Sequence, residues 1–350
     1  MIRASKYIAT PPGATIREQL NDRGMSQKEF ATRMSMSEKH ISKLINGEVL
    51  LTPDTSQKLE MVLGIPAKFW NNLESIYRDK LTKIKYENSI ASDIIIVKKL
   101  PYNEMSKYGW IGQTNDVVER VMNARKYFEV VDLGLIVNKC KMNIACRRLA
   151  INEKSDLALM AWAQQAKILA RTIPVSVINT KLLLRSIPVI RNMTDMKPNV
   201  FCPKIKELFS HCGIALVFLP HLQGSFLQGA TFIDNNKIVI GITTRGRDAD
   251  KFWFSLFHEI AHIILGHIYK NNGVTDNDER EADRWASDNL IDDTAYSLFS
   301  KHGNYTERSI VDFAKEQGIA PGIVVGRMQR DKIIRYNMYN KLKEKYVIAI

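Results

Sequence analysis

A chain of 350 residues is long enough for two or three domains, and its net charge of +13 favours a polyanionic partner. Its four cysteines form no C-x-x-C pair, which argues against a disulfide framework and against a cysteine zinc site. The N-terminal residues lack the apolar core of a secretion signal, and no run approaches the roughly 18 apolar residues of a membrane span. From these features we expect a protein that is neither secreted nor membrane-spanning, and therefore a cytoplasmic one.

The first part of the chain predicts five short helices separated by turn residues. Ser26 and Ser37 are placed to cap two of them. Gly47 is placed to end the helix that Ser37 begins, and Gly64 to end the fourth helix. The second and third helices are joined by a three-residue turn, which is the geometry of a helix-turn-helix. The expected helices span residues 16–23, 27–34, 38–46, 54–63 and 67–80.

The segment SQKEFATRMSMSEKHISKLINGE resembles Xre/Cro-type helix-turn-helix domains, and residues 14–80 are similar to antitoxin repressors of the HigA type. The resemblance implies a five-helix, lambda-repressor-like bundle for residues 1–80 that binds an operator in double-stranded DNA, with residues 38–46 as the recognition helix. This segment is only modestly basic, so DNA affinity is expected to depend on a homodimer. The alternative is a helical hairpin used for protein contacts. The expected DNA-contacting residues are Gln27, Lys28, Ser37, Glu38, Lys39, His40, Ser42 and Lys43.

Residues 81–130 change in character and are expected to form a linker and a helical connector, with one amphipathic helix over 115–128. Beyond it, residues 131–345 predict helices at 156–171, 182–193 and 203–211 and a strand at 214–220. Residues 229–243 read as a hairpin. This hairpin either binds a peptide substrate by strand addition or has only a structural role, and the sequence does not distinguish these alternatives.

The stretch KFWFSLFHEIAHIILGH carries the pattern H-E-x-x-H at His258, Glu259 and His262. On a helix the two imidazoles lie on one face and can bind one metal ion, with Glu259 beside them as a general base. Glu281, 19 residues after His262, lies in a second predicted helix that can return a carboxylate to the metal. The alternative is two core histidines that are hydrogen-bonded to the backbone.

The combination of this motif with EREADRWASD and the preceding hairpin resembles the ImmA/IrrE metallopeptidases. The resemblance implies a gluzincin-like α+β domain with a small β-sheet, a zinc ion held by His258, His262 and Glu281, and Glu259 as the catalytic base. Glu279 is the main competitor of Glu281 for the third ligand position, and Asp278 is a further nearby carboxylate. Members of this family cleave Xre-type repressors.

The two resemblances together predict a mainly α-helical N-terminal domain followed by an α+β domain. They favour a DNA-binding transcriptional regulator with a zinc-dependent endopeptidase that cleaves a repressor-type protein in trans or itself. The alternative is a HigA-like antitoxin or repressor, with a cognate toxin as partner, whose zinc domain acts as a sensor or interaction module. An intact general base argues against a purely structural metal site.

Overall fold

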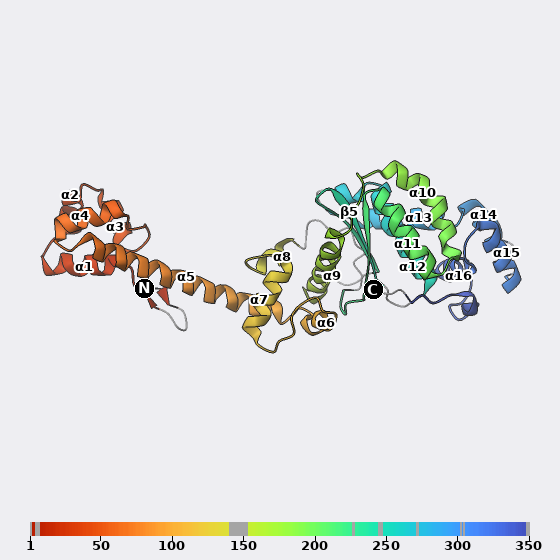
Figure 1. The fold of residues 1–350 in the computed structure, drawn as a ribbon, viewed down its shortest axis with the longest axis horizontal. Coiled ribbons are helices and arrows are strands. Elements are labelled where there is room, and N and C mark those ends of the chain that lie inside the picture. Colours follow the sequence, from red (N-terminus) through yellow and green to blue (C-terminus); the bar gives the residue numbers. More distant parts are fainter. Residues whose placement is uncertain are drawn as a thin grey trace. The chain divides into compact units, whose positions relative to one another are not determined.

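The computed structural model describes residues 2–3, 8–139, 153–225, 228–243, 248–270, 273–301, 303 and 305–347. The chain divides into two compact units, Met1–Ile95 and Ile96–Ile350, and each is described here by itself (Figure 1). The predicted order, a helical domain followed by an α+β domain with a small sheet, is confirmed. Within the described residues, no helix is long and apolar enough to cross a membrane.

In its described residues, the N-terminal unit is a bundle of five helices, preceded by a short antiparallel strand pair. Its helices enclose a core of apolar side chains that includes Ile16, Phe30, Ile41, Leu59 and Trp70. The elements are β1 (Ile2–Arg3), β2 (Ile8–Ala9), α1 (Pro12–Asp22), α2 (Gln27–Arg33), α3 (Glu38–Ile45), α4 (Pro53–Leu63) and α5 (Ala67–Val97).

Serine caps begin both α2 and α3. The Ser26 hydroxyl accepts a hydrogen bond from the Glu29 amide (3.1 Å), and the Ser37 hydroxyl accepts one from the His40 amide (3.2 Å). These caps satisfy amide groups that have no partner within the helix. Between the two helices, Ser35 adopts a left-handed backbone conformation with φ of 53°, which lets the chain turn sharply. The caps and the turn account for the helix-turn-helix expected here.

Helix α5 is much longer than the fifth helix expected from the sequence, which ended near residue 80. It continues to Val97 through the segment whose β-branched residues were interpreted as part of a linker. Ile84 and Val97 on its second half are buried, so packing has outweighed the weak preference of β-branched residues for extended backbone. The connector that follows contains α6 (Tyr102–Lys107) and α7 (Val117–Phe128).

The C-terminal unit combines a three-stranded sheet with helices on both of its faces. The sheet consists of β3 (Ile214–Leu219), β4 (Gly229–Asp234) and β5 (Lys237–Thr243). Besides α6 and α7, the helices are α8 (Gly134–Lys139), α9 (Glu153–Arg171), α10 (Thr180–Asn192), α11 (Pro198–His211), α12 (Ala249–Ile264), α13 (Asp276–Leu290), α14 (Asp293–Lys301), α15 (Glu307–Gln317) and α16 (Pro321–Arg330). The 3₁₀ helices in the described part of this unit are η1 (Met193–Asp195), η2 (His267–Tyr269) and η3 (Asn340–Leu342).

In the sheet, β5 lies in the middle, parallel to β3 and antiparallel to β4. Alternate residues of β3 and β5 pack into one core with α11 and α12, while α9 covers the other face. At Gly241 the approach of α9 is so close that a Cβ atom would lie 2.6 Å from the Trp162 ring. Because both faces of these strands are covered, the apolar runs are continuous rather than alternating. The predicted hairpin is formed by β4 and β5, and β4 lies at the edge of the sheet.

Helices α12 and α13 pack against each other beside this sheet. The Phe257 ring lies near the Trp285 ring, and the next turn of α12 brings His262 close to Glu279. Residues later in α12 therefore meet residues earlier in α13, so the two helices run antiparallel. This pairing positions the side chains of the H-E-x-x-H motif.

Candidate metal centre

Helix α12 carries the H-E-x-x-H motif in the interior of the C-terminal unit. Apolar residues lie on nearly every side of it, among them Trp253, Leu256 and Ile260, all fully buried. His258 and His262 are only 4% and 0% exposed, so both imidazoles are removed from water. Spaced four residues apart, they lie on one face of the helix, and their Nε2 atoms are 3.1 Å apart.

A carboxylate from α13 completes this group, and it belongs to Glu279. Its oxygens lie 3.2 Å from Nε2 of His258 and 3.6 Å from Nε2 of His262. One ligand atom from each of these three residues falls within 4.8 Å of the others. The structure therefore brings together two imidazoles and one carboxylate, a set typical of zinc sites in peptidases.

Glu281, which the sequence analysis assigned as the third ligand, does not join this group. Its carboxylate lies 3.4 Å from Nε2 of His267 and is 54% exposed. The reason is helical geometry, since two residues along an α-helix turn the side chain by about 200° and place it on the opposite face. Glu281 instead clusters with His267 and Asp278.

The sequence contains a signal that could have distinguished the two glutamates. Ala282, Ala286 and Leu290 are buried along one face of α13. Glu279 precedes them by 3, 7 and 11 residues, so it shares their inward face. Glu281 is out of phase with that apolar pattern.

The three side chains fit a divalent cation such as zinc. Ligand bonds of about 2.0–2.1 Å in a tetrahedral zinc site place the ligand atoms roughly 3.3 Å apart. The three separations here, 3.1, 3.2 and 3.6 Å, lie close to that value. Both carboxylate oxygens of Glu279 are also shielded from solvent without a hydrogen-bond partner among the described residues. A cation between the three groups would satisfy them.

The opposite ring nitrogen of each histidine is held by a further side chain. Nδ1 of His258 lies 2.9 Å from Oδ1 of Asp283, and Nδ1 of His262 lies 3.1 Å from Nδ1 of His267. Nε2 of His267 in turn lies 3.7 Å from Oδ1 of Asp278. Such outer contacts set the tautomer and the ring orientation of metal-binding histidines. No pattern in the sequence predicts this role of Asp283.

The protonation of the two imidazoles is strongly biased without a metal. Burial lowers the pKa of His258, but its contacts with Asp283 and Glu279 outweigh that effect and raise it to about 10. Burial and the charge of His258 lower the pKa of His262 to about 3. One proton is therefore held on His258, opposite a neutral His262. A bound cation takes the place of that proton, because metal ligands must be deprotonated.

Glu259 is fully enclosed beside this group. Its Oε2 accepts a hydrogen bond of 2.6 Å from the Thr231 hydroxyl on β4. Burial raises the pKa of Glu259 to about 7, while the charge of His258 and the Thr231 hydrogen bond act in the opposite direction. A carboxyl group with this pKa can accept and release a proton near neutral pH. Thr231 was not identified from the sequence, because it lies 28 residues before Glu259 in the chain.

The N-terminal unit presents a separate polar surface along α3. Its inward face buries Ile41, Leu44 and Ile45. The residues expected to contact DNA lie on the outer side or at the helix starts, and all of them are exposed or partly exposed: Gln27, Lys28, Ser37, Glu38, Lys39, His40, Ser42 and Lys43. The Ser37 hydroxyl already caps α3.

Comparison with protein families gives two matches, one in each unit. Residues 16–70 match the helix-turn-helix family, and residues 221–328 match the family described as the IrrE N-terminal-like domain, Peptidase_M78. The second match contains His258, Glu259, His262 and Glu279.

Similar proteins are found for the N-terminal unit. An uncharacterized HTH-type transcriptional regulator, YddM of Escherichia coli K12, is 35% identical over 66 residues, which are 19% of this chain and 70% of that protein. A solved structure, an addiction module antidote protein of the HigA family from Coxiella burnetii, shares 26% sequence identity. The match covers 24% of this chain and 92% of the chain in that structure, with a TM-score of 0.22. The chain thus belongs to the HTH-type transcriptional regulators through its N-terminal unit, and its C-terminal unit carries an IrrE N-terminal-like domain.

Proposed function

We propose that this DNA-binding regulator is also a zinc-dependent endopeptidase that cleaves a repressor-type protein, in trans or within its own chain. The observation that carries the proposal is the convergence of His258, His262 and Glu279 next to the buried carboxyl group of Glu259. In this assignment His258, His262 and Glu279 hold the metal, and Glu259 is the general base. Glu279 takes the ligand position that the sequence analysis gave to Glu281.

A bound zinc ion would supply the Lewis acidity that peptide hydrolysis requires. The chain itself supplies the proton transfers. Glu259 accepts a proton from the attacking water and then delivers it to the nitrogen of the departing amine. Its elevated pKa suits both steps, and Thr231 holds one of its oxygens in place.

The substrate backbone is proposed to bind along the edge strand β4. Among the described residues β4 pairs only with β5, so no strand occupies its other side. The Thr231 contact ties β4 to Glu259, and a peptide added along this edge would pass beside the base. An extended loop of a repressor has the conformation that strand addition needs.

The proposed DNA interface is the outer side of α3 together with the start of α2. Lys39 and Lys43 are exposed there, and their positive charges suit phosphate contacts. Helix α3 would enter the major groove as the recognition helix, and dimerisation would double the number of contacts.

The experiment that tests the metal centre compares zinc content in wild type, Glu279→Gln and Glu281→Gln. The two variants make the same chemical change two residues apart, so one is the matched control for the other. We expect about one zinc ion per chain in wild type and in Glu281→Gln, and loss of zinc in Glu279→Gln. Zinc that is lost only in Glu281→Gln would refute the ligand set.

Proteolysis is tested by incubating the full chain with Xre-type repressors and following the fragments by mass spectrometry. Glu259→Gln keeps the metal ligands and removes the base, so we expect zinc to remain and cleavage to stop. Wild type that binds zinc but cleaves neither a repressor nor itself would instead support the antitoxin-like function, with the zinc domain as an interaction module.

A further inference from the structure

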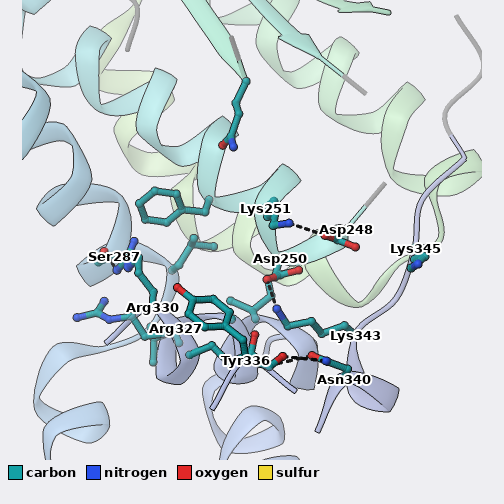
Figure 2. A pocket seen from close by; sticks show the side chains of 17 residues that line it. Asp248, Asp250, Lys251, Ser287, Arg327, Arg330, Tyr336, Asn340, Lys343 and Lys345 are labelled. Atoms are coloured by element: carbon teal, nitrogen blue, oxygen red, sulfur yellow. Dashed lines mark hydrogen bonds and ion pairs between the residues drawn. The ribbon is translucent and has the colours of Figure 1, made fainter. Parts of the chain in front are cut away.

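A cavity of about 490 Å³ opens in the C-terminal unit beside the metal centre. Its walls come from the first turns of α12, the end of α13, α16 and the segment that follows α16 (Figure 2). Its volume is in the range of pockets that bind small molecules. Lys251 and Phe254 in its wall precede His258 on the same helix by seven and four residues. At about 1.5 Å per residue, the cavity therefore begins roughly 6–10 Å along the helix from that imidazole.

Positive charge dominates the lining of this cavity. The charged lining residues are Lys251, Arg327, Arg330, Lys343 and Lys345 on the one hand, and Asp248 and Asp250 on the other. Three of the five cations are committed to close ion pairs. Lys251 and Lys343 each lie 2.7 Å from an aspartate of the lining, and Arg327 lies 2.7 Å from Asp331. Arg330 lies farther from its acidic neighbour, 3.7 Å from Asp331, and the five cations still outnumber the two aspartates of the lining.

The guanidinium of Arg330 is oriented by contacts with neighbouring side chains, in a way that suits an anion. This guanidinium lies over the Phe254 ring at 4.3 Å from the ring centroid, and its Nη2 donates a hydrogen bond to the Ser287 hydroxyl. Its side chain is still 39% exposed. A guanidinium fixed by stacking loses little conformational entropy on binding, and its planar donors match a carboxylate or a phosphate.

The rest of the lining is apolar or tied down by hydrogen bonds. Leu290, Ile291 and Ile323 contribute an apolar wall next to Phe254. The carboxamide of Gln329 donates hydrogen bonds to the carbonyl oxygens of Tyr336 and Met338 and to Oδ1 of Asn340. These bonds hold the segment after α16 in place over the cavity. Because these bonds already order the wall, a ligand loses little binding free energy to ordering it, which favours affinity.

Two polar atoms of the lining lack a partner. Within the described part of the chain, Oδ1 of Asp250 and Nη1 of Arg327 are buried and make no hydrogen bond. A buried polar atom without a partner is energetically unfavourable. One atom is an acceptor and the other a donor, so a ligand with both kinds of polar group, admitted by a small side-chain movement, would satisfy them.

We propose that this cavity binds a small organic anion that has a flat apolar body and a carboxylate or phosphate group. The anionic group pairs with Arg330, and the apolar body lies against Phe254 and the aliphatic wall. The volume of the cavity exceeds what a single acidic side chain fills, which favours a free small molecule. The inference does not rest on the proposed proteolysis, because binding can be measured directly.

The test uses the full chain and isothermal titration calorimetry with two matched pairs of probes. AMP and phenylacetate carry the phosphate and the carboxylate, and adenosine and phenylacetamide are their neutral counterparts. We expect at least one anion to bind and its neutral counterpart to bind at least about tenfold more weakly. The comparison of AMP with phenylacetate shows which anionic group the site prefers. Absence of binding by both anions at millimolar concentration overturns the proposal, as does equal binding of anion and neutral counterpart.

Substitutions locate the bound anion. Arg330→Gln removes the charge that pairs with the anion, and Phe254→Leu removes the ring beneath that guanidinium; each is expected to weaken binding by about tenfold or more. Phe254→Leu keeps an apolar side chain in the wall, so it tests the site even if Arg330→Gln impairs folding. Arg308→Gln and Lys341→Gln are the matched controls, since both side chains are exposed and lie outside the lining. Unchanged affinity in both lining variants would place the anion elsewhere and refute the proposal.

Discussion

The Thr231 hydroxyl donates a 2.6 Å hydrogen bond to Oε2 of Glu259, joining the edge strand β4 to the helix of the H-E-x-x-H motif. Both residues are buried, at 0% and 2% exposure. The bond therefore fixes the proposed base relative to the strand along which the substrate is proposed to bind.

Replacing Thr231 by valine tests this contact with little change in side-chain shape. A hydrogen bond to a charged group contributes about 1.5–3 kcal/mol, so loss of positioning is expected to lower kcat for repressor cleavage by roughly ten- to hundredfold. Zinc content should not change. Thr231→Ser, which retains the hydroxyl, should keep most of the activity. Equal rates for Thr231→Val and wild type would remove the positioning role.

Gly229, two residues before Thr231, has no side chain, and the carboxyl group of Glu259 occupies the space where one would lie. A Cβ atom at this position would lie 2.7 Å from Oε1 of Glu259, which is too close for a non-bonded contact. We expect Gly229→Ala to displace the carboxyl group and to abolish cleavage, with zinc still bound because the ligands are untouched. The measurement is cleavage rate and zinc content on the same preparation. Full activity in Gly229→Ala would show that the base does not sit where the structure places it.

Nδ1 of His267 contacts Nδ1 of the proposed metal ligand His262. Loss of such an outer contact typically costs about 10–100-fold in metal affinity. We expect His267→Ala to lower zinc affinity by that factor in competition with a chelator, without abolishing binding. His211→Ala is the control, because His211 is an exposed histidine at the end of α11. Identical affinities for wild type and His267→Ala would contradict this role.

The proposed DNA interface predicts a change in salt dependence. Double substitution Lys39→Ala with Lys43→Ala removes two cations from the outer side of α3. If both contact phosphates, the slope of log K against log salt should become shallower by roughly two. Lys58→Ala with Lys68→Ala removes the same charge from α4 and α5 and should leave the slope unchanged. The measurement is fluorescence anisotropy with duplex DNA over a range of salt. An unchanged slope in the α3 variant would exclude this face.

Several features follow from the sequence alone because they depend on local geometry. The spacing of His258 and His262 places both imidazoles on one face of any helix that contains them. The serine caps of α2 and α3 depend on residues three apart in the chain, and the hairpin of β4 and β5 depends on adjacent strands. The order of a helical domain and an α+β domain follows from the same kind of local pattern.

The tertiary structure decided the features that depend on how elements pack. Whether Glu279 or Glu281 meets the imidazoles depends on which face of α13 docks on α12, and burial of Ala282 and Ala286 turns Glu279 inward. The contacts of Glu259 with Thr231 and of His258 with Asp283 join segments more than twenty residues apart. The length of α5 likewise follows from burial of Ile84 and Val97 rather than from local preference. Chain periodicity gives the direction of a side chain about its own helix, and only packing determines what that side chain meets.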